Sequence, residues 1–108
     1  MMIYGLSTCD TCRKARAALP GATFRDIRAQ PLDRAEIQQI LDTFGQAAVN
    51  RASTTWRTLD EAQRARPLPD LLADHPTLLK RPLIRIGDQM FQGWTPSVQE
   101  AVRQSLPE

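Results

Sequence analysis

Two cysteines three positions apart are the residues of this chain best suited to covalent chemistry. They lie in Cys9-Asp10-Thr11-Cys12, between a short apolar run at 2–6 and a series of helix-forming residues at 11–19. A thiol at the start of a helix faces unpaired backbone N–H groups and the positive end of the helix dipole, which favour the thiolate. We therefore predict that Cys9 is a nucleophile and that Cys12, one turn later, is its resolving thiol.

The cysteine pair has two other interpretations. A zinc site normally takes four ligands, and because His75 is the only histidine, a site within one chain would have to recruit carboxylates. Two inert thiols are the other alternative. Arg13, four residues after Cys9, is a candidate to hold an anion beside the sulfur, although with Lys14 and Arg16 it also fits a solvated basic face.

The surrounding sequence predicts a β-α-β unit followed by a hairpin and a helix. Pro20-Gly21 ends the first helix, Gly87-Asp88 has the chemistry of a tight turn, and Thr95-Pro96 has that of a helix start. The expected elements are a strand at 2–6, a helix at 11–19, a strand at 23–28, a hairpin at 83–92 and a helix at 95–106. This order predicts an α/β protein with a thioredoxin-like fold.

The middle of the chain predicts an inserted helical subdomain. Asp33 and Glu36 have capping-box spacing, and apolar residues recur at helical period from Ile37 to Phe44, before Gly45. The segment 50–56 has polar loop chemistry, and helices are expected at 59–66 and 70–75. We predict one domain over 1–108, with a thioredoxin-like core at about 1–30 and 77–106 and the insert at about 31–76.

Composition limits the classes of partner and the location. The 108 residues, 42% of them apolar, suffice for one compact core. Fourteen basic and twelve acidic residues give a net charge of +2 with no block of like charge, so we expect neither nucleic-acid nor membrane binding. No apolar run approaches roughly 18 residues and no signal-peptide pattern is present, so we expect a cytoplasmic protein with reduced thiols.

Three motifs together resemble the arsenate reductase (ArsC)-like family, which includes the Spx transcription regulators and a reductase-like branch labelled YffB. They are Tyr4-Gly5 before the cysteine motif, the run 50–61, and Lys80-Arg81-Pro82-Leu83. Within the run, Thr-Thr-Trp-Arg-Thr-Leu-Asp-Glu points to the YffB branch. The resemblance implies a thioredoxin-like fold with a helical insert, a cis-proline at Pro82 and an anion-binding arginine at Arg81, which is otherwise a surface residue beside a turn.

The chain departs from the arsenate reductases of this family. These carry His-x-x-x-Cys-x-x-x-Arg, whereas this chain has Gly5 at the histidine position and keeps Cys9 and Arg13. A second family arginine falls beside Arg51, which is a shifted candidate for anion binding. A third is replaced by Gly93-Trp94, whose indole either admits a bulkier thiol such as a glutathionyl group or packs against the core. Since an oxyanion site needs several cations, these losses disfavour arsenate.

The resulting prediction is a thiol-dependent oxidoreductase with no metal and no bound cofactor. Cys9 attacks the substrate, and either Cys12 or external glutathione, with glutaredoxin as a further candidate partner, releases the product. One alternative is a redox-sensing regulator that binds RNA polymerase, as the resemblance to Spx implies. The other is an arsenate reductase that depends on glutathione and glutaredoxin.

Overall fold

A computed structural model describes residues 1–106 and divides the chain into two compact units. The sheet unit combines Met1–Ile27 with the chain from Arg81 onward, and the helical unit is Arg28–Lys80. The helical unit is thus longer at both ends than the predicted insert at 31–76. At its C-terminal end the extension has a physical basis, because Leu79 forms an antiparallel bridge with Val49 and the Lys80 N–H donates to the Ala48 carbonyl at 2.8 Å.

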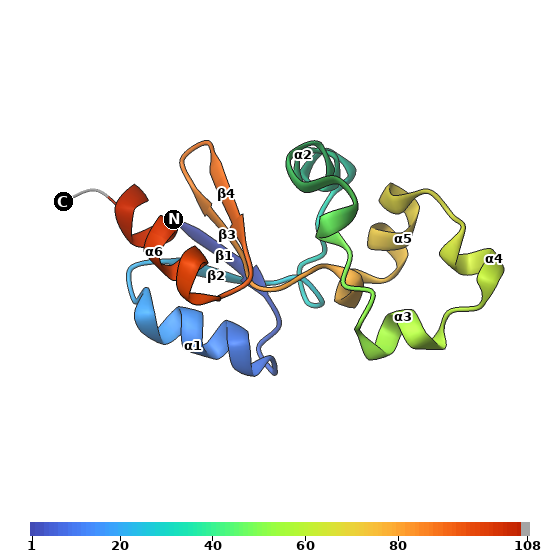
Figure 1. The fold of residues 1–108 in the computed structure, drawn as a ribbon, viewed down its shortest axis with the longest axis horizontal. Coiled ribbons are helices and arrows are strands. Elements are labelled where there is room, and N and C mark those ends of the chain that lie inside the picture. The colour runs from blue at the N-terminus through green and yellow to red at the C-terminus, as the bar shows by residue number, and fades with distance from the viewer. Residues whose placement is uncertain (107–108) are drawn as a thin grey trace. The chain divides into compact units, whose positions relative to one another are not determined.

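The sheet unit contains a four-stranded mixed sheet in the order β2-β1-β3-β4 (Figure 1). The strands are β1 (Met2–Gly5), β2 (Thr23–Asp26), β3 (Leu83–Ile86) and β4 (Gln89–Gln92). Strand β1 runs parallel to β2 and antiparallel to β3, and β3 and β4 form the hairpin. The α/β class, the thioredoxin-like order of strands and the hairpin are as predicted from the sequence.

Helices α1 (Asp10–Ala18) and α6 (Pro96–Ser105) cover one face of this sheet. Ile3 of β1 lies opposite Ile84 of β3, so both side chains project to the same face. There they form one buried cluster with Leu19, at the end of α1, and Val102 of α6. This apolar contact fixes α1 against β1, and it thereby sets the position of the cysteine motif at the start of α1.

The helical unit is built on α2 (Arg34–Phe44), whose start matches the prediction closely (Figure 1). The Asp33 carboxylate accepts from the Glu36 N–H at 2.8 Å, and the Glu36 carboxylate accepts from the Asp33 N–H at 3.0 Å, which completes a capping box. The other helices are η1 (Gly45–Ala48), α3 (Thr54–Thr58), α4 (Glu61–Arg64), α5 (Leu68–Asp74) and η2 (Pro76–Leu78). Within the described residues, no helix has both the length and the apolar character needed to cross a bilayer.

Two predictions for this unit need correction. The segment 50–56 is not a loop throughout, because Ser53 Oγ accepts from the Trp56 N–H at 3.1 Å and starts α3. The helix expected at 59–66 is a single turn, α4, over Glu61–Arg64. It begins after Asp60, whose carboxylate accepts from the Gln63 N–H at 2.8 Å. Polar side chains that cap short helices have the same sequence pattern as loop residues, which is the reason for both differences.

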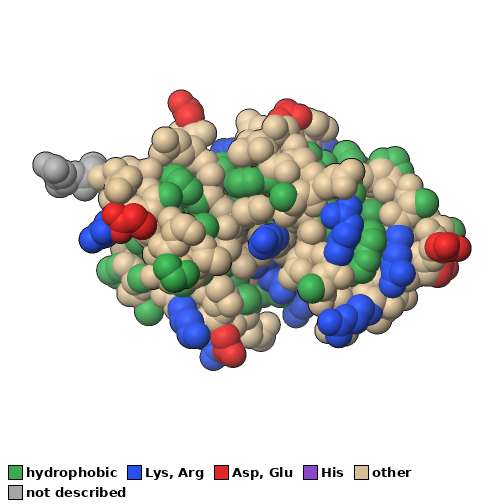
Figure 2. Space-filling view, viewed as in Figure 1, with side chains coloured by type: hydrophobic (Ala, Val, Ile, Leu, Met, Phe, Trp, Pro, Cys, Tyr) green, Lys and Arg blue, Asp and Glu red, His purple; other side chains and the backbone are tan. Residues whose placement is uncertain are grey.

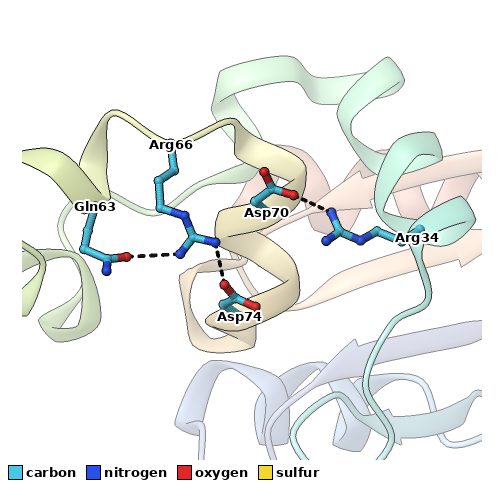
Figure 3. Close-up of polar contacts among 5 residues, drawn as sticks. All are labelled: Arg34, Gln63, Arg66, Asp70 and Asp74. Atoms are coloured by element: carbon cyan, nitrogen blue, oxygen red, sulfur yellow. Dashed lines mark hydrogen bonds and ion pairs between the residues drawn. The ribbon is translucent and has the colours of Figure 1, made fainter.

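Side-chain contacts on the surface of the helical unit link its segments (Figure 3). Arg34 of α2 pairs with Asp70 of α5 at 2.8 Å. Arg66, just before α5, pairs with Asp74 at 2.5 Å and donates to Gln63 at 3.1 Å. The side chains of these two ion pairs are between one-third and two-thirds exposed, so each pair stabilises the fold only slightly.

Candidate active site at the start of α1

Cys9 is the residue that precedes the first turn of α1, at the end of a short turn after β1. Its N–H donates to the Leu6 carbonyl at 3.1 Å, and within the same turn the Ser7 N–H donates to the Asp26 carboxylate at 3.0 Å. The Cys9 carbonyl accepts the first bond of the helix, from the Arg13 N–H at 3.0 Å. The turn is thus anchored at both ends, and it presents a half-buried thiol in free form.

The environment of Cys9 favours its thiolate. Partial burial acts to raise the pKa of the Cys9 thiol, but the backbone N–H and thiol of Cys12 and the guanidinium of Arg81 together outweigh it. The net pKa lies below that of an ordinary cysteine.

Cys12 is in the opposite state. Cys12 lies on the buried face of α1 and is 0% exposed, and its thiol pKa is raised to about 11, mainly by burial. This value is the net of several effects: burial is the largest, the hydrogen bond with Cys9 and the negative charge of the Cys9 thiolate also raise the pKa, and the Leu6 backbone and the Arg81 charge oppose the rise. The two thiols therefore have clearly separated acidities, with Cys9 as the more acidic group.

Arg81, which precedes β3 and is distant in sequence, acts on the same two thiols. Arg81 interacts with the Cys9 sulfur through both a hydrogen bond and its charge. The Arg81–Pro82 peptide bond is cis, the conformation that the resemblance implied. Pro82 is buried immediately before β3, and its carbonyl accepts from the Gly93 N–H at 2.8 Å.

The other two arginines predicted to bind an anion have different partners. Arg13 forms an ion pair with Asp10, one turn earlier, and their side chains are 59% and 84% exposed. Arg51 lies in the helical unit, where it donates to the Gln46 carbonyl at 3.2 Å and stacks over the Trp56 ring at 5.3 Å from its centroid. A role for either of them at the cysteine site stays a prediction.

The structure adds two features that the sequence analysis missed. Gly5, the last residue of β1, lies directly against the Cys12 sulfur, and the Leu6 backbone is a polar neighbour of the same sulfur. Glycine at the end of an apolar strand was the available signal, because it often marks a close approach by another group. For Trp94 the structure favours packing, since its indole lies against the buried cluster of the sheet unit.

These contacts define what the site is able to do chemically. A stabilised, half-buried thiolate is a nucleophile, and a protonated thiol beside it is a latent second nucleophile. A cationic arginine next to both stabilises negative charge on sulfur or on a bound anion. Across the part of the chain that the structure describes, no group of three or more His, Cys, Asp or Glu residues is placed to hold a metal ion.

Comparisons with known proteins identify the family and agree with the fold. Residues 4–102 match the family model described as the ArsC family. The solved structure of a YffB protein superposes with a TM-score of 0.85 and 34% identity, over 93% of this chain and 96% of that one. An uncharacterized protein of Haemophilus influenzae is 37% identical over 76% of this chain and 80% of its own length. The global transcriptional regulator Spx of Bacillus subtilis is 30% identical, over 97% of this chain and 86% of its own length.

Proposed function

This chain belongs to the ArsC family, and from that premise we propose that it is a thiol-dependent reductase whose nucleophile is Cys9. The observation that carries the proposal is the separation of the two thiol acidities within one contact pair: the pKa of Cys9 is lowered, while that of Cys12 is raised to about 11. In a pair of this kind one thiol is ionised and reacts first, and the second stays protonated until the mixed disulfide has formed.

The proposed reaction is a thiol–disulfide exchange. The Cys9 thiolate attacks one sulfur of a substrate disulfide, forms a mixed disulfide and expels the other half as a thiolate, which takes a proton from water. Cys12 then loses its proton and attacks the Cys9 sulfur, which releases the remaining half as a thiolate and leaves a Cys9–Cys12 disulfide. The substrate gains two electrons, and two molecules of a small thiol such as glutathione return them to the protein.

The contacts of Cys12 explain how its thiol would become acidic enough to act as the resolving nucleophile. Both the charge of Cys9 and its hydrogen bond raise the Cys12 pKa in the resting site. A mixed disulfide on Cys9 carries no charge and is a poor acceptor for the Cys12 S–H, so both contributions largely end when it forms. The lowering effects of the Leu6 backbone and Arg81 remain. Formation of the intermediate therefore acidifies the thiol that resolves it.

The arginines favour electrophilic sulfur over arsenate as the target. Of the two sheet-unit arginines predicted to bind an anion, Arg81 interacts with the Cys9 sulfur, whereas Arg13 is in an ion pair with Asp10. Binding of a free oxyanion calls for several donors or cations around it. A disulfide sulfur needs only transient stabilisation of the thiolates that form, which one guanidinium supplies.

The roles of the two thiols are tested by intact-mass measurement after exposure to oxidised glutathione. We expect a lasting glutathione adduct on Cys12→Ser and none on Cys9→Ser, because only Cys9 attacks and only Cys12 resolves. The wild type should pass through the adduct to an internal disulfide, which is two hydrogens lighter than the dithiol. An adduct that persists on Cys9→Ser but not on Cys12→Ser would reverse the proposed roles.

Activation of Cys9 by Arg81 is tested separately by the pH dependence of Cys9 alkylation. Replacing Arg81 with Gln removes both a hydrogen bond and a positive charge, so the thiol pKa should rise towards the ordinary value. Arg103→Gln is the matched control, because Arg103 is an exposed arginine of α6 that pairs with Glu100. An unchanged Cys9 pKa in Arg81→Gln would show that the guanidinium does not activate the thiol.

A second candidate function is a redox-dependent regulator that binds RNA polymerase. The supporting observation is the 30% identity to the global transcriptional regulator Spx over 97% of this chain. In addition, the helical unit has a Trp56 ring with the guanidiniums of Arg51 and Arg64 over it, at 5.3 and 5.4 Å from its centroid. Figure 2 shows basic side chains bordering hydrophobic surface on this unit, a composition typical of protein-binding surfaces.

Pull-down of purified RNA polymerase by the oxidised and reduced protein distinguishes the two functions. A regulator should bind in one redox state and not in the other, and Trp56→Ala should weaken the binding. Arg103→Gln, in the sheet unit, is the control for a general loss of charge. Equal or absent binding in both states would count against the regulatory function and would leave the reductase proposal intact.

A further inference from the structure

Gly5 occupies a position where the structure leaves no space for a side chain. It is buried at the end of β1 and pairs with Asp26 of β2. A Cβ atom placed on Gly5 would lie 2.5 Å from the Cys12 sulfur and 3.3 Å from the Cys12 Cβ. Real Cβ atoms essentially never come within 3.0 Å of such a neighbour. The sulfur of Cys12 therefore fills the volume that a side chain at position 5 would need.

Backbone conformation does not explain this glycine. The glycines with positive φ are Gly45, Gly87 and Gly93, and Gly5 is not among them. Any residue can adopt an extended strand conformation, so the requirement at position 5 is for space alone. That space is used by one atom, the sulfur of the proposed resolving thiol.

We infer that Gly5 is a positioning residue for Cys12, and that it is the residue that permits a second thiol in this site. The inference rests on the proposed reductase function. With glycine at position 5, the Cys12 sulfur lies against β1, where it contacts the Leu6 backbone and the Cys9 sulfur. Any other residue at position 5, from alanine to histidine, has a Cβ atom that must either displace that sulfur or push α1 away from β1.

Neither way of relieving the overlap preserves the site. Cys12 is 0% exposed, so a rotation of its side chain moves the sulfur within packed surroundings and away from its present partners. A shift of α1 disturbs the packing of Ala15, which is also 0% exposed on the same face of the helix. In both cases the Cys12 sulfur loses its geometry relative to Cys9, and Cys9 loses a hydrogen bond that lowers its pKa.

The test is Gly5→Ala, alone and combined with Cys12→Ala. In Gly5→Ala, the mixed disulfide of Cys9 with glutathione should persist roughly ten- to a hundredfold longer than in the wild type, the factor that overpacking by one methyl group implies. The Cys9 pKa should also rise. Gly21→Ala is the matched control, because Gly21 is exposed, has no positive φ and has nothing within 4 Å of an added Cβ.

The double variant separates positioning from general damage to the strand. Without the sulfur, the added Cβ meets only the Cys12 Cβ at 3.3 Å and the Phe24 ring at an ordinary contact distance of 3.5 Å, so the Gly5→Ala change should cost much less stability in the Cys12→Ala background than in the wild type. If Gly5→Ala alone fails to fold, recovery of folding in the double variant supports the inference. An equal loss of stability in both backgrounds, or a mixed disulfide resolved at the wild-type rate, overturns it.

Failure of the reductase proposal gives a different pattern. In that case no glutathione adduct forms on Cys9 in the wild type or in any variant. The stability comparison between the two backgrounds does not depend on the reaction, and it still decides whether the Cys12 sulfur excludes a side chain at position 5.

Discussion

The separation of the two thiol acidities predicts a large difference in their alkylation rates near neutral pH. The Cys12 pKa of about 11 leaves roughly one thiol in ten thousand ionised at about pH 7. A cysteine at the ordinary pKa of 9.0 is ionised to roughly one part in a hundred under the same conditions. Cys12 should thus react about 100-fold more slowly than a free cysteine, and its full burial slows it further. Cys9, with a lowered pKa, should react faster than Cys12 by at least this factor.

The assay is labelling of the reduced wild type with iodoacetamide, followed by peptide mapping of the singly labelled species. Initial rates are needed, because alkylation of Cys9 removes the charge that raises the Cys12 pKa and so accelerates the second reaction. Above neutral pH the Cys12 rate should rise about tenfold per pH unit up to about pH 11, whereas the Cys9 rate should level off at a lower pH than that of an ordinary cysteine. The urea-unfolded protein is the control, in which both cysteines should react alike.

A specific result would refute the reasoning. If Cys12 is labelled within about tenfold of the Cys9 rate in the folded protein near neutral pH, the burial and charge effects assigned to it are wrong. If Cys12 is labelled first, the roles of nucleophile and resolving thiol are reversed.

Three predictions concern stability and are checked by urea unfolding. Folding raises the pKa of Cys12 from the ordinary value of 9.0 to about 11, so its contribution to stability is complete below about pH 9 and falls by about 1.4 kcal/mol per pH unit towards pH 11. Cys12→Ala should lack this alkaline loss. Ile84→Ala should cost roughly 2–5 kcal/mol, because Ile84 is 0% exposed in the core cluster, and a cost below that of Ile84→Val would contradict its central position. Asp33→Ala should cost about 1 kcal/mol by removing the capping box, whereas Asp33→Ser should retain most of the stability.

Local signals in the sequence were sufficient for much of the fold. The capping residues at 33 and 95 act on N–H groups three positions later, at Glu36 and Val98, so both partners are visible in a short stretch of sequence. The hairpin turn at Gly87 is equally local, with φ at 58°. The same approach failed for α3, because Ser53 and the polar residues after it fit both a loop and a short capped helix, and local patterns do not separate the two.

The sequence by itself determined that Cys9 stands at a strand-to-helix junction with a second thiol one turn later. Those features depend on residues a few positions apart, where the geometry of the helix leaves little choice. Only the tertiary structure decided that Arg81 reaches the Cys9 sulfur, that the pKa of Cys12 rises to about 11, and that Gly5 leaves the space which the Cys12 sulfur fills. Burial, charge and excluded volume at a thiol are set by groups from distant parts of the chain, so they are defined only once the sheet and its helices have packed together.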